Sequence, residues 1–356
     1  MKKLMKGNEA IAEAAIQAGC KCYFGYPITP QNEIPEYMSW RLRDMGGIFK
    51  QAESEVASIN MVYGAAACGV RALTSTSGLG IALMQEGITN LVSTEIPGVF
   101  INVMRGGPGL GTIQASQADY NQMTRGGGNG DYFIVAYAPS TLQEACDLMQ
   151  KSFDTAFKYR NPVALVVDAT IGAMMESVDI KENVQPDPSV PDPKTWCVQG
   201  GKRADGSYSM IKGLYNVPAD SEAWNLKNAE KYDLIRKNET MVDIVDCDDA
   251  DVVIVAFGTT ARIARQVLKL GRQNGVKIGM VRPVTIWPFP YEQLAEATKN
   301  CKGVLCAEMA IDQLKQDVDI ALKGSKPVYT YHRLSGVMPS AKDMFALCEK
   351  IAKEAK

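Results

Sequence analysis

Apolar runs and helical periods alternate along the first 178 residues of the chain. Helices are predicted at residues 8–18 and 54–68, and a longer one begins at Thr141. Continuous apolar runs, typical of strands buried on both faces, cover residues 72–77, 98–104, 132–138 and 162–168. Strands and helices that alternate at this spacing predict an α/β domain with a mainly parallel sheet, covered by helices on both faces.

Residues at the ends of these segments support the predicted helices. Ser54 has the side chain of an N-cap, and Gly69 stands just past the other end of the same helix. Thr141, followed by Glu144 three residues later, has the pattern of a capping box. The local sequence and the periodicity therefore agree on where these helices begin and end.

The pattern changes after residue 178. The run QPDPSVPDP contains four prolines and is followed by a polar stretch, and prolines at that density form neither a helix nor a central strand. We expect residues 179–245 to be a linker or an extended arm that packs across another surface. From residue 246 to residue 356 apolar runs and helices alternate again, which predicts a second, smaller α/β domain after the first domain, residues 1–178.

Composition and charge narrow the class of protein. The chain has 356 residues, of which 46% are hydrophobic and 22% charged, and its formal net charge is −2. A single core rarely grows to this length, so two domains are expected. The near-neutral charge argues against nucleic acid or an anionic membrane as partner. No signal peptide and no apolar run long enough for a membrane span are apparent, so we expect a cytoplasmic protein.

Cysteine and histidine usage excludes several kinds of site. The nine cysteines are an odd, scattered set, and we expect reduced thiols. Neither the pair Cys20 and Cys22 nor the pair Cys301 and Cys306 has zinc or iron–sulfur spacing. His332 is the one histidine, which argues against histidine acid–base chemistry and a histidine metal site. We therefore predict no metal in this chain.

Three glycine-rich loops are candidates for ligand binding. TSTSGLG, RGGPGLG and RGGGNGD cover residues 74–80, 105–111 and 125–131, and none matches a dinucleotide fingerprint or a P-loop. Each loop alone is interpreted as an ordinary turn in which glycine supplies positive φ or close packing. Two of the loops directly follow predicted strands, and ligands bind at the carboxyl ends of strands in open α/β sheets. Together the loops outline a crevice.

Two further segments carry polar groups that could act there. YPITP, residues 26–30, has two prolines that fix an extended loop able to hold the hydroxyl of Thr29 in place, although an ordinary turn has the same residues. Glu55 falls in the first turn of a predicted helix, where an acid also complements the helix dipole. Neither segment identifies a function by itself.

Read together, the motifs resemble a known family. YPITP, ESEVASINMVYGAAACG, TSTSGLG and NVMRGGPGLG stand in the order and approximate spacing of the alpha subunit of 2-oxoacid:ferredoxin oxidoreductases. The likeness runs over almost all of residues 1–178, and residues 257–290 are similar to the transketolase-C-terminal-like domain of the same proteins. QAESEVASINMVYG and VMRGGPGLG most resemble the branched-chain (2-oxoisovalerate) members. The resemblance implies a thiamine-diphosphate pyrimidine-binding domain followed by a transketolase-C-terminal-like domain.

The resemblance also implies a cofactor that is shared between subunits. In this family the alpha chain holds the aminopyrimidine ring of thiamine diphosphate, while a beta subunit binds the diphosphate and Mg²⁺ and carries a [4Fe–4S] cluster. Gamma and ferredoxin-like subunits, ferredoxin and coenzyme A take part as well. This sequence has neither the GDG-type motif nor cluster cysteines, and GNGD at residues 128–131 is not an equivalent. We therefore expect Mg²⁺ and clusters on partner subunits and no turnover by this chain alone.

Position in the family motifs assigns roles to individual residues. The resemblance implies that Glu55 binds N1′ of the pyrimidine ring. Glu55 is preferred over Glu53 because the spacing from Glu55 to Gly64 fits the motif. At Gly64 the helix is expected to approach its neighbours. Thr29 and Arg105 match the positions that bind the substrate carboxylate, with a loop-stabilising ion pair as the alternative for Arg105. The remaining residues expected beside the cofactor are Pro27, Ser77 and Gly78.

Several alternatives remain open. Pyruvate, 2-oxoglutarate or an aryl pyruvate could be the substrate, because discrimination among small tails is worth only about 1–3 kcal/mol. The chain could also be a non-catalytic scaffold that holds a beta-type subunit and binds coenzyme A through its second domain. An NAD-dependent dehydrogenase is disfavoured by the missing dinucleotide fingerprint and the lack of a catalytic histidine.

Overall fold

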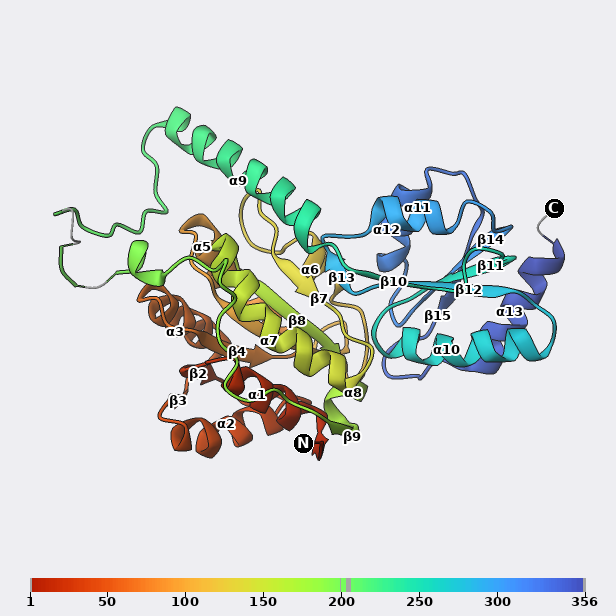
Figure 1. Cartoon of the computed structure of the whole chain (residues 1–356), viewed down its shortest axis with the longest axis horizontal. Coiled ribbons are helices and arrows are strands. Elements are labelled where there is room, and N and C mark those ends of the chain that lie inside the picture. Colours follow the sequence, from red (N-terminus) through yellow and green to blue (C-terminus); the bar gives the residue numbers. More distant parts are fainter. Residues whose placement is uncertain (1, 199, 203–205, 355–356) are drawn as a thin grey trace.

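The computed structural model describes residues 2–198, 200–202 and 206–354, which form two α/β units side by side (Figure 1). The larger sheet is made of β2 (Cys22–Gly25), β3 (Ile48–Gln51), β4 (Ala72–Thr76), β5 (Val99–Gly106), β6 (Thr112–Ala115), β7 (Val135–Tyr137), β8 (Val163–Asp168) and β13 (Thr285–Trp287). Its order is β13-β7-β8-β5-β4-β2-β3, with β6 paired to β5. From β7 to β3 all neighbours run parallel, so the prediction of a mainly parallel sheet is confirmed.

Two layers of helices cover this sheet. The helices of this unit are α1 (Gly7–Gln17), α2 (Glu33–Asp44), α3 (Glu55–Ala67), α4 (Leu79–Leu83), α5 (Gln85–Ser93), α6 (Tyr120–Thr124), α7 (Leu142–Tyr159) and α8 (Ala169–Ala173). α1 contacts α2 and α7, whereas α3 contacts α5, as expected for helices on opposite faces. A short ribbon of β1 (Lys3–Lys6) and β9 (Met175–Val178) lies beside them.

The predicted caps form hydrogen bonds at the helix starts. The hydroxyl of Ser54 accepts from the backbone N–H of Ala57 at 3.2 Å, and the hydroxyl of Thr141 accepts from the N–H of Glu144 at 3.2 Å. Each bond satisfies a donor that the first turn of a helix leaves without a partner. The Ser54 cap fixes where α3 begins, and with it the place of Glu55.

The smaller sheet has the order β10-β12-β11-β14-β15. These strands are β10 (Val242–Val245), β11 (Val252–Val255), β12 (Ile278–Pro283), β14 (Gly303–Glu308) and β15 (Val328–His332), and the helices of the same unit are α10 (Gly258–Gln273), α11 (Tyr291–Ala297), α12 (Gln313–Leu322) and α13 (Ala341–Glu354). Only β10 runs antiparallel to its neighbour among these described strands. This unit follows the alternation of apolar runs and helices predicted from the sequence.

The segment expected to be a linker contains more regular structure than the sequence predicted. Its first part packs on the larger unit, where the N–H of Val184 bonds the backbone oxygen of Gln17. Its second part forms a long helix, α9 (Pro218–Glu239), which lies across the larger unit in Figure 1. The prediction missed α9 because its buried positions include polar residues and do not make an apolar stripe. β10, at the end of the segment, belongs to the smaller sheet.

Buried polar bonds join the two units. The carboxylate of Asp168, at the end of β8, accepts from the N–H of Thr259 at 2.8 Å and from its hydroxyl at 2.6 Å. The side chain of Gln117 donates to the backbone oxygen of Phe257 and accepts from the N–H of Met309, both across the junction.

Within the described residues, no helix combines the length and the apolar character that a membrane crossing demands.

Removing the carboxylate of Asp168 should destabilise the chain. Asp168→Ala leaves the N–H and hydroxyl of Thr259 buried without an acceptor, so we expect the free energy of unfolding to fall by about 3 kcal/mol. Urea denaturation measures this change. The control is Asp147→Ala on the exposed side of α7, expected to change stability by less than about 0.5 kcal/mol. A loss at Asp168 no larger than that of the control would contradict its role at the junction.

Candidate active site

The loops that follow β2 and β4 meet the end of β5 at one edge of the larger sheet. Carboxyl ends of parallel strands share an edge, so these segments come together although they are distant in sequence. Arg105, near the end of β5, donates from Nη1 to the backbone oxygen of Thr29 at 2.7 Å. Gly78 lies in the turn after β4, and a Cβ atom there would be 2.8 Å from Nε of Arg105. The structure thus brings three of the predicted residues together.

Glycine is required at position 78 by conformation and by space. Its φ of +53° is one that other residues rarely adopt, and the guanidinium of Arg105 occupies the volume that a side chain would need. The predicted glycine-rich turn therefore places backbone directly against the arginine.

Arg105 keeps hydrogen-bonding capacity for a ligand. Its side chain is buried, with 8% of the residue exposed, and its Nε has no hydrogen-bond partner among the residues the structure describes. The hydrogen bond that its Nη1 donates goes to a backbone oxygen and not to a carboxylate, so the alternative of a loop-stabilising ion pair gains no support from the described residues. Nε is covered by the backbone of Gly78, but Nη2 also has no hydrogen-bond partner among the described residues. A guanidinium with such an unpaired group is suited to bind a carboxylate.

Glu55 is buried in the first turn of α3, next to the turn after β4. A Cβ atom on Gly80 would lie 2.6 Å from Oε1 of Glu55 and 2.0 Å from the hydroxyl oxygen of Thr76. Only 5% of Glu55 is exposed, and its carboxylate has no hydrogen-bond partner among the described residues. Glu53, the competing acid, is exposed. Burial therefore singles out Glu55 of the two.

Buried hydroxyls near Glu55 also lack partners. The hydroxyls of Thr74, Thr76 and Ser77, in β4 and the turn that follows, are buried without a hydrogen bond within the described part of the chain. A buried polar group left without a partner costs about 1–3 kcal/mol, so such a cluster indicates a ligand site. A buried carboxylate and hydroxyls beside a glycine are groups of the kind that bind the ring nitrogens and amino group of an aminopyrimidine.

Other predicted residues contribute differently from what the sequence suggested. Pro27 is exposed, and the hydroxyl of Thr29 accepts from Nδ2 of Asn32 at 3.2 Å, so that its carbonyl, not its hydroxyl, meets Arg105. The expectation that α3 approaches its neighbours at Gly64 is wrong within this chain. Gly64 is exposed, and a Cβ atom there would meet nothing within 4 Å.

A cleft of about 510 Å³ opens beside Arg105 between the two units. Only two of its lining residues in the described structure are charged, Arg105 and Asp119. The apolar side chains of the lining are Leu79, Ala82, Pro108, Ala118, Met309, Ala310, Ile311 and Leu334. The cleft therefore combines one cation and one acid with a mainly apolar wall.

Asp119 is a site residue that the sequence did not predict. Its Oδ2 accepts from Nδ2 of Asn102, a buried residue of β5, at 3.0 Å. Burial raises the pKa of Asp119 to about 6, although the hydrogen bond from Asn102 and the charge of Arg105 both lower it. Asp119 precedes the short helix α6, so in the sequence it reads as a helix cap. Only the fold shows that it faces the cleft.

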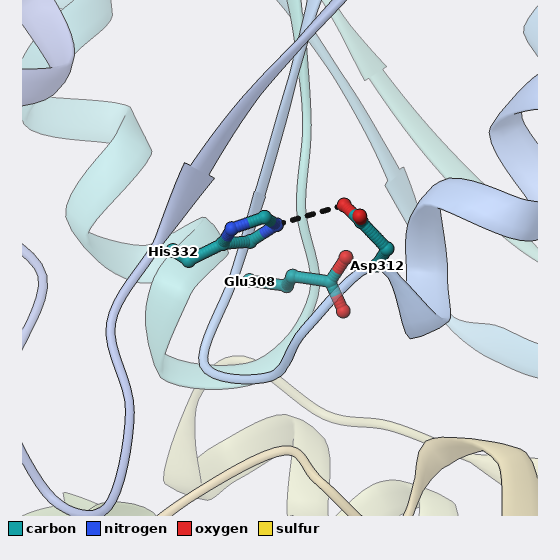
Figure 2. A group of neighbouring side chains, drawn as sticks. All are labelled: Glu308, Asp312 and His332. Atoms are coloured by element: carbon teal, nitrogen blue, oxygen red, sulfur yellow. Dashed lines mark ion pairs between the residues drawn. The ribbon is translucent and has the colours of Figure 1, made fainter.

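The wall contributed by the smaller unit is held by a buried carboxylate. Glu308, at the end of β14, accepts from the backbone N–H groups of Gln313, Leu314 and Lys315, which fixes the loop of residues 309–312. Figure 2 shows Glu308 beside Asp312 and His332, whose Nε2 lies 3.0 Å from Oδ1 of Asp312. Atoms of these three groups lie within 4.8 Å of one another. Because the oxygens of Glu308 already serve backbone donors, we interpret the group as a loop anchor.

Sequence comparison finds two matching families. Residues 13–208 match the family described as pyruvate flavodoxin/ferredoxin oxidoreductase, thiamine diphosphate-binding, and residues 250–344 match core domain II of pyruvate:ferredoxin oxidoreductase. The chain is 39% identical to the ketoisovalerate oxidoreductase subunit VorB of Methanothermobacter marburgensis, over 99% of both chains. It is 33% identical to the 2-oxoglutarate synthase subunit KorA of the same organism, over 93% of this chain and 94% of KorA.

The solved structures that share the fold include the following two. The 2-oxoglutarate:ferredoxin oxidoreductase from Magnetococcus marinus superposes with a TM-score of 0.85 and 23% identity, over 99% of this chain and 65% of that chain. A split-gene transketolase superposes with a TM-score of 0.62 and 15% identity, over 99% of both chains. The predicted fold, with a transketolase-like second domain, is confirmed.

The close approach at Gly80 can be tested with two glycine substitutions. In Gly80→Ala the new Cβ collides with Thr76 and Glu55, so we expect the free energy of unfolding to fall by about 1–3 kcal/mol. In the control, Gly64→Ala, the Cβ meets nothing, and the better helix propensity of alanine should raise stability by up to about 1 kcal/mol. Chemical denaturation compares the two, and equal effects would speak against the geometry described.

Proposed function

The chain belongs to the 2-oxoacid:ferredoxin oxidoreductase family, and on that premise we propose that it supplies the pyrimidine-binding half of an active site for branched-chain 2-oxoacids. As a subunit of such an oxidoreductase it takes part in the ferredoxin-dependent, coenzyme A-acylating oxidative decarboxylation of 2-oxoacids with thiamine diphosphate. The assignment of residues, the branched-chain substrate and the identity of the partner subunits are proposals.

Glu55 has the surroundings required to bind N1′ of the aminopyrimidine. When bound, thiamine diphosphate supplies a carbon nucleophile for the keto carbon and an electron sink for decarboxylation. A buried carboxyl group at N1′ favours the ring tautomer whose amino group can take up a proton, provided that no protein donor competes for the carboxyl. Glu55 is buried and free of such a donor among the described residues. Ser77 is buried in the turn after β4 and Gly78 of the same turn packs against Arg105, whereas Pro27 is exposed.

The guanidinium of Arg105, which lines the cleft and has only one hydrogen-bond partner among the described residues, is the observation that carries the proposed function. A 2-oxoacid presents a carboxylate next to its keto group. The Nη1 group of Arg105 is bonded to Thr29, and its Nη2 group has no hydrogen-bond partner among the described residues and is available to that carboxylate. Thr29 then acts by orienting Arg105 through its carbonyl. Charge-assisted hydrogen bonds of this kind are worth about 1.5–3 kcal/mol each and hold the substrate next to the site of Glu55.

The lining of the cleft supports an apolar substrate tail. Leu79, Met309 and Ile311 are among the side chains that face it, and Arg105 is its one cation among the described residues. A second carboxylate, as in 2-oxoglutarate, would find no cation there and would face Asp119. A branched aliphatic tail can instead bury apolar surface, worth about 25 cal/mol per Å².

The remaining components are assigned to partner subunits. We propose that a beta subunit supplies the diphosphate and Mg²⁺ site and a [4Fe–4S] cluster, and that gamma and ferredoxin-like subunits complete a cytoplasmic complex that reduces ferredoxin. Val56 follows Glu55 in α3, and Leu79 and Leu83 belong to α4. Their side chains are exposed, and exposed apolar side chains of this kind are suited to be covered by another subunit.

Substitution of Glu55 tests the catalytic role. In the assembled complex, Glu55→Gln should lower the rate of 2-oxoacid-dependent viologen reduction at least about 100-fold, because the amide cannot support the proton chemistry at N1′. Glu53→Gln, a change of the exposed neighbouring acid, should leave the rate within about twofold. An unchanged rate in Glu55→Gln would instead favour a non-catalytic scaffold.

A substrate panel tests the tail specificity. We expect kcat/KM of the complex for 2-oxoisovalerate to exceed that for 2-oxoglutarate by about 100-fold or more, and that for pyruvate by about 10-fold, because pyruvate loses apolar contacts and 2-oxoglutarate buries an unpaired charge. Coenzyme A-dependent viologen reduction with each acid provides the values. A preference for 2-oxoglutarate or pyruvate would overturn the branched-chain proposal.

A further inference from the structure

Asp119 has one carboxylate oxygen held and the other free. Oδ2 accepts from Asn102, whose side chain is fully buried, so the carboxyl group has a fixed orientation. Oδ1 has no hydrogen-bond partner among the described residues, and Asp119 belongs to the lining of the cleft beside Arg105. The structure therefore presents one oriented acceptor oxygen to whatever enters the cleft.

The surroundings of Asp119 make it more basic than an exposed carboxylate. Arg105 on β5 is the charged group that acts on it, and the other cleft-lining residues of α6 and α12 near it are Gln122 and Gln313, which are neutral. Burial outweighs the charge of Arg105 and holds the pKa near 6. The carboxyl group of Asp119 is thus ionised at neutral pH. Its pKa is nevertheless close enough to neutral pH for the group to take up a proton, as a general base must.

Asp119 has no evident role in binding the 2-oxoacid. The substrate carboxylate is attracted by Arg105 and repelled by a second carboxylate, so Asp119 does not improve substrate binding. In the proposed reaction, CO₂ leaves from the position beside Arg105, and coenzyme A then enters with a thiol that must lose its proton. A thiol of ordinary pKa, about 8.5, is largely protonated at neutral pH, so its attack needs a nearby base.

We propose that Asp119 is the general base that deprotonates the thiol of coenzyme A during acyl transfer. This inference rests on the proposed function. The S–H bond breaks and its proton moves to Oδ1 of Asp119, while the sulfur forms a bond to the acyl carbon. The bond between that carbon and thiamine diphosphate would then break, and its electron pair would return to the cofactor, which is the leaving group. The two electrons of the oxidation pass to ferredoxin through the partner subunits, as the family reaction requires. Arg105, free of the substrate carboxylate at this stage, stabilises the developing negative charge on sulfur.

The experiment separates the steps before and after coenzyme A. In the assembled complex, the iron–sulfur clusters are reduced with 2-oxoisovalerate alone in a rapid-mixing instrument, and coenzyme A is added in a second mix. In Asp119→Asn we expect the first phase to keep its wild-type rate within about twofold, because Asn keeps an oxygen for the bond from Asn102. The second phase should slow by about 100-fold or more.

A second variant guards against a structural explanation. Asp119→Ala should show the same selective loss, and added formate, a small carboxylate that can occupy the vacated space, should restore the second phase at least several-fold. The exposed Asp131→Asn serves as control and should change neither phase.

Three outcomes would overturn the inference. Equal slowing of both phases would mean that Asp119 acts on Arg105 or on substrate binding. An unchanged second phase, or no rescue by formate, would mean that it takes no proton from the thiol. Failure of the proposed function looks different, because the wild-type complex itself would then show no reduction by any 2-oxoacid.

Discussion

The hydrogen bond from Arg105 to the carbonyl of Thr29 is the contact on which the site depends. It joins the loop after β2 to the end of β5, and β4 lies between these two strands in the sheet. The turn after β4 must therefore pass directly against the guanidinium, which only glycine allows at position 78. The turn leads into α4, where Gly80, lacking a side chain, leaves the space that Glu55 occupies. One bond between two loops thus lies next to both the group that we propose to bind the substrate carboxylate and the groups that we propose to bind the pyrimidine ring.

Much of this arrangement could be predicted from the sequence, because local signals determine it. Ser54 begins α3 and so buries Glu55 in the first turn, and the buried strand β5 brings Arg105 to the carboxyl edge. What the sequence could not show depends on distant partners. Glu239 of α9 is buried because Lys151 and Lys158 of α7, more than 80 positions earlier, neutralise it. Asp119 has the sequence context of a helix cap, and only its contact with Asn102 reveals a fixed acceptor. Neither partner can be read from the local pattern.

The distribution of unsatisfied polar groups matches the proposal that the chain is half of an active site. In the described structure, the hydroxyls at the end of β4 and Nε of Arg105 are buried without partners, and each costs stability until a ligand binds. Cofactor and partner binding would recover these costs, which links assembly to the formation of the site. The exposed Gly64 fits the same picture: α3 is open on the side where the family motif led us to expect a close neighbour.

The strand β13 has a consequence for how the chain is made. It lies within the part of the sequence that otherwise builds the smaller unit, yet it pairs with β7 at the edge of the larger sheet. The ribosome synthesises the chain from its N-terminus. β7 therefore remains an unpaired edge strand until about 150 further residues have left the exit tunnel. The larger sheet therefore cannot be completed before β13 has been synthesised. Until then the nascent chain has an unpaired edge strand, to which other strands can pair. α9 is synthesised between β7 and β13. In the folded protein it lies close to this edge of the sheet, because Tyr232 of α9 packs edge-on against Trp287 of β13. α9, which the sequence did not predict, is thus available to cover the unpaired edge of β7 before β13 is synthesised.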